Sequence, residues 1–413
     1  MNWLGLLLLI YLAGSLLDRV LSWLNMRHHQ RELPAELAPY MDAEAYAKAY
    51  EYHRTNFRFG LLKSSISIVF TTLLLAMGAF GWLDGQLRGI TEDPIGLPLL
   101  YFATLFILSD VLSLPFAWYQ TFTIEERFGF NKTTPKTFWL DKLKGYALAL
   151  VFGGLVMGVL LWLVNELGAD FWLWFWLFIS LFTLFMNVFY TSLLLPLFNK
   201  LTPLEAGELR QKIEAYSAGV KFPLDNILVM DGSRRSAKAN AFFSGLGKQK
   251  KVVLFDTLVE KHSQEELVAV LAHEVGHYKK RHIILGYFFS VLQTGLVLFL
   301  LSRFILSPEL SFALGAETYG IHLNLMAFGI LYSPISLVIG LLMNLLSRKN
   351  EFEADAYAAD TYDAAPLREA LIRLHTDSLA NLTPHPWFVF FHYSHPPLLS
   401  RLAALRSTAI SPA

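Results

Sequence analysis

The sequence predicts an all-α integral membrane protein with seven transmembrane helices and one small α+β insert. Of the 413 residues, 54% are hydrophobic, and the mean hydropathy is +0.42. Only 16% of the residues are charged, against roughly 25% in a typical soluble domain. Seven apolar segments are each about 20 residues or longer, which is the length that a helix needs to cross a bilayer.

The apolar segments form two groups, with five before a long polar loop and two after it. In chain order they are residues 2–24, 62–83, 95–118, 145–165, 171–198, 283–306 and 323–346. A cleaved signal peptide is the alternative for the first segment. We expect a retained helix instead, because its first residues include no Lys or Arg and no small-residue cleavage site precedes the charged stretch that follows.

Basic residues are distributed very unevenly among the loops. Four regions hold 31 of the 34 Lys and Arg residues, namely 25–63, 119–144, 199–282 and 347–413. Only Arg88 lies in the alternate loops, which are residues 84–94, 166–170 and 307–322. Because basic loops stay in the cytoplasm, we expect a multi-pass protein with its N-terminus outside and its C-terminus in the cytoplasm. The formal net charge of zero indicates no nucleic-acid partner.

These patterns divide the chain into four regions. We expect five transmembrane helices in 1–198, a cytoplasmic insert in 199–282, two helices in 283–346 and a C-terminal helical region in 347–413. Within the insert, "NILVMDGS" (226–233) and "KVVLFDT" (251–257) are rich in Val, Ile and Leu, and they predict short strands. The stretch between them, "ANAFFSGLGKQ" (239–249), predicts another strand and a glycine-containing turn.

A metal-binding motif ends the insert, in "HSQEELVAVLAHEVGHYKK". Ser263, with Glu266 three residues later, forms a capping box that predicts the start of a helix. His273 and His277 then lie four residues apart on one helical face, where both imidazoles can bind the same ion. Glu274 lies about 100° round the helix from the first histidine, so it suits proton removal from water and not metal binding. A chance match to this pattern is the alternative.

A catalytic zinc ion usually has three protein ligands, so a third ligand is needed. The chain has no cysteine, which leaves His, Asp or Glu. The best candidate is Glu351, just after the last apolar segment in "SRKNEFEADAYAAD". Asp355, one helical turn further on, can hydrogen-bond the free ring nitrogen of a ligand histidine. Glu353 should point elsewhere, onto the surface. An ordinary acidic, solvated helix end is the alternative for the whole stretch.

A third cluster, "HYSHPPLLSRLAAL", lies near the C-terminus. Pro396 and Pro397 fit the start of a helix, with His395 just before it and Arg401 about one and a half turns inside it. A histidine beside a metal-bound substrate can stabilise an oxyanion. The alternative is an ordinary helix cap with an arginine on the surface.

Together these motifs resemble those of the type I CAAX prenyl endopeptidases, a family of integral-membrane zinc proteases that process farnesylated proteins. The matching stretches are "TIEERFGFNK" (123–132), "NAFFSG" (240–245), "VVLFDTL" (252–258), "LAHEVGHYK" (271–279), "EFEADAYA" (351–358) and "HYSHPPLLSRL" (392–402). The resemblance implies one zinc ion per chain, bound by His273, His277 and Glu351. It also implies that Glu274 is the general base.

The resemblance has further implications for substrate binding and for the membrane helices. It implies that His395 and Arg401 lie near the scissile bond, and that Asn240 and Ala241 belong to an edge strand that aligns the substrate. It also implies that the seven helices enclose a water-filled chamber. A metal facing such a chamber is reached by water although lipid surrounds the helices.

We therefore expect a zinc-dependent membrane endopeptidase that acts near the cytoplasmic face, within membrane lipid, on a peptide or protein substrate with or without a prenyl group. The last residues, "ISPA", contain no ER-retention signal, and the insert is short, so we expect a bacterial cytoplasmic membrane. One alternative is a membrane quality-control protease of broad specificity without a prenyl requirement. Another is a non-enzymatic seven-helix transporter or metal-binding scaffold, which leaves Glu274 unexplained.

Overall fold

The structure is a computed structural model that describes residues 2–408, with gaps at 34, 36–37, 40 and 245–249. Its long helices are α1 (Trp3–His28), α2 (Ala43–Ala76), α4 (Gly96–Tyr119), α6 (Pro135–Leu148), α7 (Gly154–Leu167), α8 (Phe171–Phe189), α13 (His282–Phe304) and α15 (Ile321–Thr361). Its shorter helices are α3 (Ala79–Arg88), α5 (Glu126–Phe128), α9 (Leu195–Phe198), α10 (Glu208–Gly219), α11 (Asp256–Lys261), α12 (Gln264–Lys279), α14 (Pro308–Ala313), α16 (Ala364–Asp377), α17 (Pro386–His392) and α18 (Leu398–Thr408).

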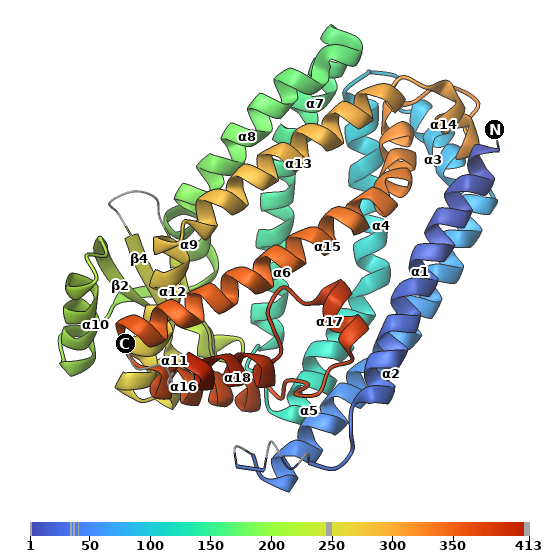
Figure 1. Ribbon diagram of the computed structural model, residues 1–413. Helices are drawn as coiled ribbons and strands as arrows, with labels where there is room; N and C mark the ends of the chain where they lie inside the picture. Colours follow the sequence, from blue (N-terminus) through green and yellow to red (C-terminus); the bar gives the residue numbers. More distant parts are fainter. Residues whose placement is uncertain (1, 34, 36–37, 40, 245–249, 409–413) are drawn as a thin grey trace.

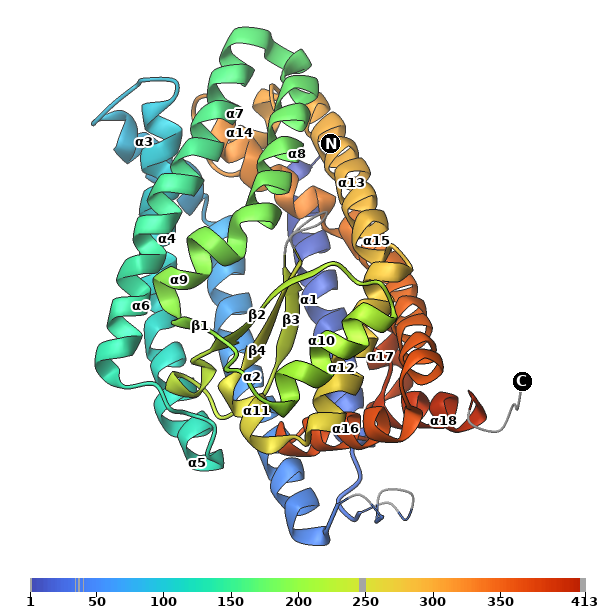
Figure 2. The ribbon, with the colours of Figure 1, turned by 90° about the vertical axis from the view of Figure 1, so that its left-hand side faces the viewer.

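The long helices run between two ends of the molecule that differ in structure. Figure 1 shows α3 and α14 at one end, and the strands with α16 and α18 at the other. Figure 2, turned by 90°, shows α10, α11 and α12 at the same end as the strands. The predicted all-α fold with a small α+β part is therefore confirmed. The strands and the shorter helices packed around them lie together at one end of the long helices.

Six helical runs within the described residues are long and apolar enough to cross a membrane. They are Trp3–His28, Ala43–Ala76, Gly96–Phe128, Pro135–Phe198, His282–Phe304 and Ile321–Thr361. In each run at most 22% of the most apolar window is buried inside the protein, so most of these apolar residues are not covered by the protein's own core.

The fourth run contains two of the seven predicted segments. A 3₁₀ turn at Gly168–Asp170 interrupts it, and Gly168 has a φ of 57°, which is a left-handed value that glycine adopts without strain. After this turn α8 packs beside α7, and Leu161 and Phe171 share one buried cluster (Figure 1). The number of membrane crossings stays a prediction, as does the chamber.

A four-stranded sheet lies in the predicted insert. Its strands are β1 (Leu201–Pro203), β2 (Leu224–Met230), β3 (Ala241–Ser244) and β4 (Lys250–Phe255), in the order β1-β2-β4-β3. The β2–β4 pair is parallel, and the β1–β2 and β3–β4 pairs are antiparallel. Each of the three strand predictions overlaps an observed strand, but the predicted glycine turn falls at 245–249, outside the described residues. Strand β3 lies at an edge of the sheet, where one side of its backbone has no partner strand.

Helix α12 joins this sheet to the membrane helices. Ser263 Oγ accepts a hydrogen bond from the Glu266 backbone N–H at 3.2 Å, as the capping box predicts. The Glu266 carboxylate does not complete the box, because it pairs with His262 Nδ1 at 2.6 Å. The apolar face of α12 is buried in the largest core cluster of the sheet region, and its members include Leu267, Leu271 and Val275. Because this face of α12 packs into the core, the other face is the one that can present side chains to a metal ion or a substrate.

Helix α15 runs without interruption from the far end of the molecule into the sheet region. It has 41 residues, which corresponds to about 60 Å at 1.5 Å per residue. The expected boundary between 283–346 and 347–413 therefore falls inside one continuous helix. A side chain near residue 350 is thus held by the same rigid element that forms the last apolar segment.

Candidate metal centre

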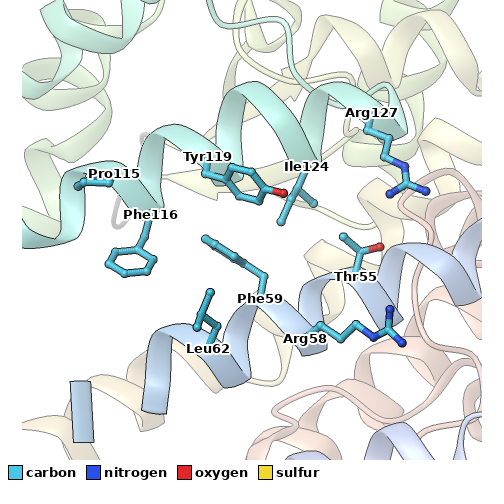
Figure 3. Close-up of a pocket in the computed structure, with 9 residues that line it drawn as sticks. All are labelled: Thr55, Arg58, Phe59, Leu62, Pro115, Phe116, Tyr119, Ile124 and Arg127. Atoms are coloured by element: carbon cyan, nitrogen blue, oxygen red, sulfur yellow. The ribbon is translucent and has the colours of Figure 1, made fainter. Parts of the chain in front are cut away.

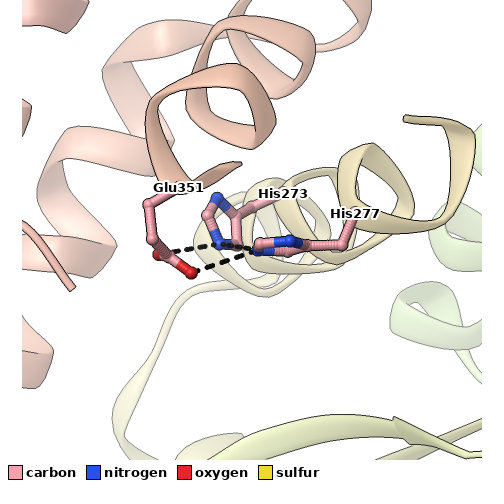
Figure 4. Close-up of side chains that lie close together, drawn as sticks. All are labelled: His273, His277 and Glu351. Atoms are coloured by element: carbon pink, nitrogen blue, oxygen red, sulfur yellow. Dashed lines mark hydrogen bonds and ion pairs between the residues drawn. The ribbon is translucent and has the colours of Figure 1, made fainter. Parts of the chain in front are cut away.

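The candidate metal centre lies where α12 crosses α15. The crossing is close because a Cβ atom on Gly276 would lie only 3.0 Å from the backbone of Ala354. Ala354 is itself fully buried. These two small residues allow His273 and His277 of α12 to meet Glu351 of α15 (Figure 4).

Three ligand atoms converge at this crossing. His273 Nε2 and His277 Nε2 are 3.2 Å apart. Glu351 Oε2 is 3.5 Å from His273 Nε2, and Glu351 Oε1 is 3.3 Å from His277 Nε2. Tetrahedral zinc with bonds of about 2.0–2.1 Å separates its ligand atoms by about 3.3–3.4 Å. The spacing of the three side chains therefore fits a tetrahedral ion.

Asp355 and Arg401 hold His273 from behind. Asp355 Oδ1 lies 2.8 Å from His273 Nδ1, and the Arg401 guanidinium binds both carboxylate oxygens of Asp355 at 2.6 and 2.7 Å. Arg401 Nη2 is also 3.5 Å from His273 Nδ1, but the much shorter aspartate contact decides the tautomer. His273 Nδ1 therefore carries the proton and donates a hydrogen bond to Asp355. The lone pair of His273 Nε2 then faces the centre.

A second hydrogen-bonded chain holds His277, and sequence reasoning missed it. Glu353 Oε2 lies 3.2 Å from His282 Nε2, and His282 Nδ1 lies 3.0 Å from His277 Nδ1. A carboxylate only accepts, so His282 donates from Nε2 and accepts at Nδ1. His277 then donates from Nδ1, and its Nε2 lone pair also faces the centre. Glu353 is 38% exposed, so its surface position was predicted in part, but its partner was not.

These proton positions leave the centre rich in acceptors. Two imidazole lone pairs and one carboxylate face one another at 3.2 to 3.5 Å. Glu351 Oε2 is buried and has no hydrogen-bond partner among the described residues. Such groups repel one another unless a cation lies between them. Two imidazoles and a carboxylate are a common donor set for Zn²⁺ in catalytic sites, so the residues fit the ion that the sequence predicts.

Glu274 lies beside this group without belonging to it. It follows His273 on α12 and is partly buried. Burial raises the pKa of its carboxyl group, and the nearby His273 and His277 oppose that rise. A carboxyl group with a raised pKa is a better proton acceptor than an ordinary glutamate. Its role as a base stays a prediction.

The structure brings His395 and Arg401 to the centre in different ways. His395 Nε2 is 3.4 Å from Glu351 Oε1, and 66% of the side chain is exposed, so a ligand can reach it. Arg401 is only 5% exposed, and its Nη1 lies 3.5 Å from Glu351 Oε2. This burial favours a positioning role for Arg401 over contact with a substrate. Contact between Arg401 and a substrate stays a prediction. The alternative of an arginine on the surface does not hold, because Arg401 is buried.

Asn240 and Ala241 lie at the start of the edge strand β3, which contacts α12. Asn240 O accepts a hydrogen bond from the Phe255 N–H at 3.1 Å, so this residue faces β4. Because successive residues of a strand face opposite ways, the Ala241 N–H points to the free edge. There it donates to Asn240 Oδ1 at 2.9 Å. The edge therefore offers backbone groups for an added strand next to the metal helix.

Two family models divide the chain at the start of the sheet. One is described as "CAAX prenyl protease N-terminal, five membrane helices" and matches residues 22–200. The other is "Peptidase family M48" and matches residues 203–409.

Similar proteins extend this match over nearly the whole chain. The CAAX prenyl protease 1 homolog of Oryza sativa subsp. japonica is 34% identical over 400 residues, which cover 93% of each chain. The Homo sapiens homolog is 33% identical, and the match covers 91% of this chain and 89% of that protein. The crystal structure of S. mikatae Ste24p has a TM-score of 0.92 at 30% identity and covers 98% of this chain and 99% of its own. The chain belongs to the CAAX prenyl protease group of peptidase family M48.

Family membership identifies the chain as a membrane metallopeptidase with several membrane-spanning helices. It confirms the resemblance predicted from the motifs, and it confirms the enzyme class. It does not favour the transporter or scaffold, nor the quality-control protease of broad specificity. The metal centre described above lies entirely within the part that matches the M48 peptidase model.

Proposed function

We propose that this M48 peptidase binds one zinc ion per chain and hydrolyses a peptide bond in a prenylated protein or peptide. The observation that carries the proposal is the set of three converging acceptors, among them Glu351 Oε2, which has no hydrogen-bond partner within the described residues. His273, His277 and Glu351 would hold the ion. Zinc bound in such a site supplies Lewis-acid polarisation of the scissile carbonyl and lowers the pKa of water.

The chain's own side chains then divide the proton transfers and the charge stabilisation. Glu274 takes a proton from the attacking water and later delivers it to the leaving amine. His395 is exposed and close to Glu351, so it can donate a hydrogen bond to the oxyanion that forms on the substrate. Arg401 and Asp355 hold His273 in the tautomer that the metal requires.

The substrate backbone would add to the sheet beside β3. An extended peptide can pair with the outward backbone groups of Ala241 once it displaces the Asn240 side chain. Strand pairing of this kind depends on backbone hydrogen bonds and discriminates little between side chains. A further feature of the substrate must therefore determine specificity. The names of the similar proteins suggest that a prenyl group on the substrate is this feature.

Cleavage would take place at the cytoplasmic side of the membrane. The distribution of basic residues supports a cytoplasmic insert, a cytoplasmic C-terminus and an N-terminus outside. A bacterial cytoplasmic membrane and a water-filled chamber between the helices belong to the same proposal.

A cleavage assay on the purified full-length chain tests this function. The substrates are a farnesylated peptide that ends in a C-a-a-X sequence and the same peptide without the farnesyl group. We expect cleavage of the farnesylated peptide only, loss of cleavage with a zinc chelator, and recovery when zinc is restored. Equal cleavage of both peptides would refute the prenyl requirement. Full activity of protein shown by elemental analysis to be free of zinc would refute the metal assignment.

A further inference from the structure

A second cavity lies away from the metal centre, between α2 and the helical run that begins with α4. Its volume is about 530 Å³, which is within the usual range for small-molecule sites. Arg58, Phe59 and Leu62 of α2 line one side, and Phe116 and Arg127 line the other (Figure 3). None of these residues takes part in the peptidase chemistry proposed above.

The lining changes from cationic to apolar along both helices. Figure 3 shows Arg58 and Arg127 at one end of the cavity, and Leu62 and Phe116 toward the other. On α2 the apolar segment begins at Leu62, and on α4 it ends just beyond Phe116. The cavity therefore crosses the boundary between an apolar membrane segment and a basic loop on each of its walls. This is the polarity profile of a membrane lipid, with a charged head and an apolar chain.

The two arginines at the polar end have no anionic partner in the part of the chain that the structure describes. Both side chains are exposed, and within the described residues neither forms a salt bridge. By contrast Arg54, one turn earlier on α2, is paired with Glu51 at 3.1 Å. Two unpaired guanidinium groups that face one cavity repel each other weakly and together attract an anion. Guanidinium groups bind phosphate particularly well, because their N–H donors match its oxygens.

An irregular helix shapes the opposite wall. Pro115 lies inside α4, and a π-helical turn follows at Gln120–Glu125. Proline removes a backbone hydrogen bond, and π turns add a residue to the helix, so both alter the direction of the side chains that follow. Tyr119 between them lines the cavity and is 48% exposed. The wall is therefore a formed recess and not the smooth surface of a regular helix.

We propose that this cavity binds one anionic phospholipid of the membrane leaflet on the basic-loop side. The lipid phosphate lies between Arg58 and Arg127, and one acyl chain lies along Phe59, Leu62 and Phe116. A zwitterionic lipid brings no net charge to the two arginines, and free phosphate leaves the apolar half empty. A zwitterionic lipid also has a phosphate and acyl chains, but its cationic group offsets the attraction of the phosphate to the two arginines, so an anionic lipid fits both ends better. Basic pockets between membrane helices commonly bind such head groups.

Native mass spectrometry of the full-length protein in detergent tests this site. The protein is loaded with phosphatidylglycerol or with phosphatidylcholine of the same acyl chains, and the bound lipid is counted per chain. Two basic contacts should favour phosphatidylglycerol about 30-fold, equivalent to about 2 kcal/mol. The double variant Arg58→Gln/Arg127→Gln should reduce this preference to about twofold or less. Unchanged thermal unfolding of the variant will show that the fold is intact.

A matched control removes two positive charges from α2, the helix that contains Arg58. Lys48 and Lys63 are exposed residues of α2 that do not line the cavity, so Lys48→Gln/Lys63→Gln should keep the preference. Equal loss in both double variants would overturn the site. So would equal retention of the two lipids by the unmodified protein. Phosphatidylglycerol with short acyl chains, and inorganic phosphate, should both bind more weakly than the long-chain lipid. Equal binding of either would refute the acyl-chain half of the proposal.

Discussion

Replacement of Asp355 with asparagine should weaken zinc binding without removing any ligand. Asp355 is 1% exposed and accepts the His273 Nδ1 proton at 2.8 Å. Asparagine has the same shape but can present an N–H to His273, which permits the wrong tautomer at the metal. Loss of such a supporting carboxylate typically lowers metal affinity 10- to 100-fold, so we expect a decrease of about this size.

The second chain of hydrogen bonds gives an internal comparison. Glu353 is 38% exposed, and it reaches His277 only through His282. Exposed ion pairs contribute about 0.2–1 kcal/mol, so Glu353→Gln should lower zinc affinity by less than about fivefold. Asp355 is buried and contacts a ligand histidine directly, whereas Glu353 is partly exposed and acts through His282. We therefore expect Asp355→Asn to lower zinc affinity more than Glu353→Gln does.

Both variants can be measured by competition against a chromophoric zinc chelator, with full-length protein in detergent at neutral pH. Far-UV circular dichroism should show that each variant retains its helices. Zinc affinity of Asp355→Asn equal to that of the unmodified protein would refute the tautomer argument. A loss in Glu353→Gln as large as that in Asp355→Asn would refute the ranking by burial.

Three further changes test the base, the edge strand and a buried histidine. Glu274→Ala should retain zinc by elemental analysis but lower turnover at least about 10²-fold, and near-normal turnover would exclude it as the base. Ala241→Pro removes an outward N–H from β3, where proline is tolerated, so kcat/KM should fall about tenfold at unchanged zinc content. Normal cleavage by that variant would exclude strand addition at this edge. Burial, and then the charges of His53 and His28, lowers the pKa of His29 from 6.5 to about 4. Below pH 6.5 the unfolded chain therefore binds a proton that the folded protein does not, so stability should fall between pH 6.5 and about 4, by up to about 3 kcal/mol. His29→Phe should lessen this decline in the thermal unfolding midpoint, and an identical pH dependence would contradict the reasoning.

The three converging side chains were predictable because they depend on helical periodicity. His273 and His277 are one turn apart on α12, so any helix through them brings their rings together. Glu351 could be chosen because the chain has no cysteine and because Glu351 and Asp355 lie four residues apart, on one helical face, just after the last apolar segment. Burial of Ala354 at the crossing agrees with the small side chains in that stretch.

One supporting contact was predicted, the hydrogen bond between Asp355 and a ligand histidine, which the structure places at His273. The other supporting contacts were not predictable, because they depend on the directions of separate elements. Arg281 lies between α12 and α13 and has a φ of 61°, and this left-handed residue starts α13 so that His282 lies against His277. Nothing in the residue spacing indicates that turn, so the role of Glu353 was missed. Arg401 hydrogen-bonds Asp355 although the two residues are 46 positions apart in the sequence. Helical periodicity cannot predict a contact between residues of two separate helices.

Hydropathy located the apolar segments but not their internal geometry. The window that predicts 145–165 and 171–198 depends on composition alone. It does not detect the π-helical turns at Ala149–Gly153 and Tyr190–Leu194, which depend on a shifted hydrogen-bond pattern and leave the hydrophobicity unchanged. The same limit applies to the π turn beside the proposed lipid cavity.

The division of the metal ligands between α12 and α15 also determines when the peptidase becomes active during its own synthesis. The ribosome makes His273 and His277 first, and Glu351 follows only after the last two apolar segments. Arg401, which holds Asp355 in place, is made later still. A nascent chain therefore cannot complete the set of three ligands until the last two apolar segments and Glu351 have been made. The order of residues along the chain therefore delays metal-dependent cleavage until late in synthesis.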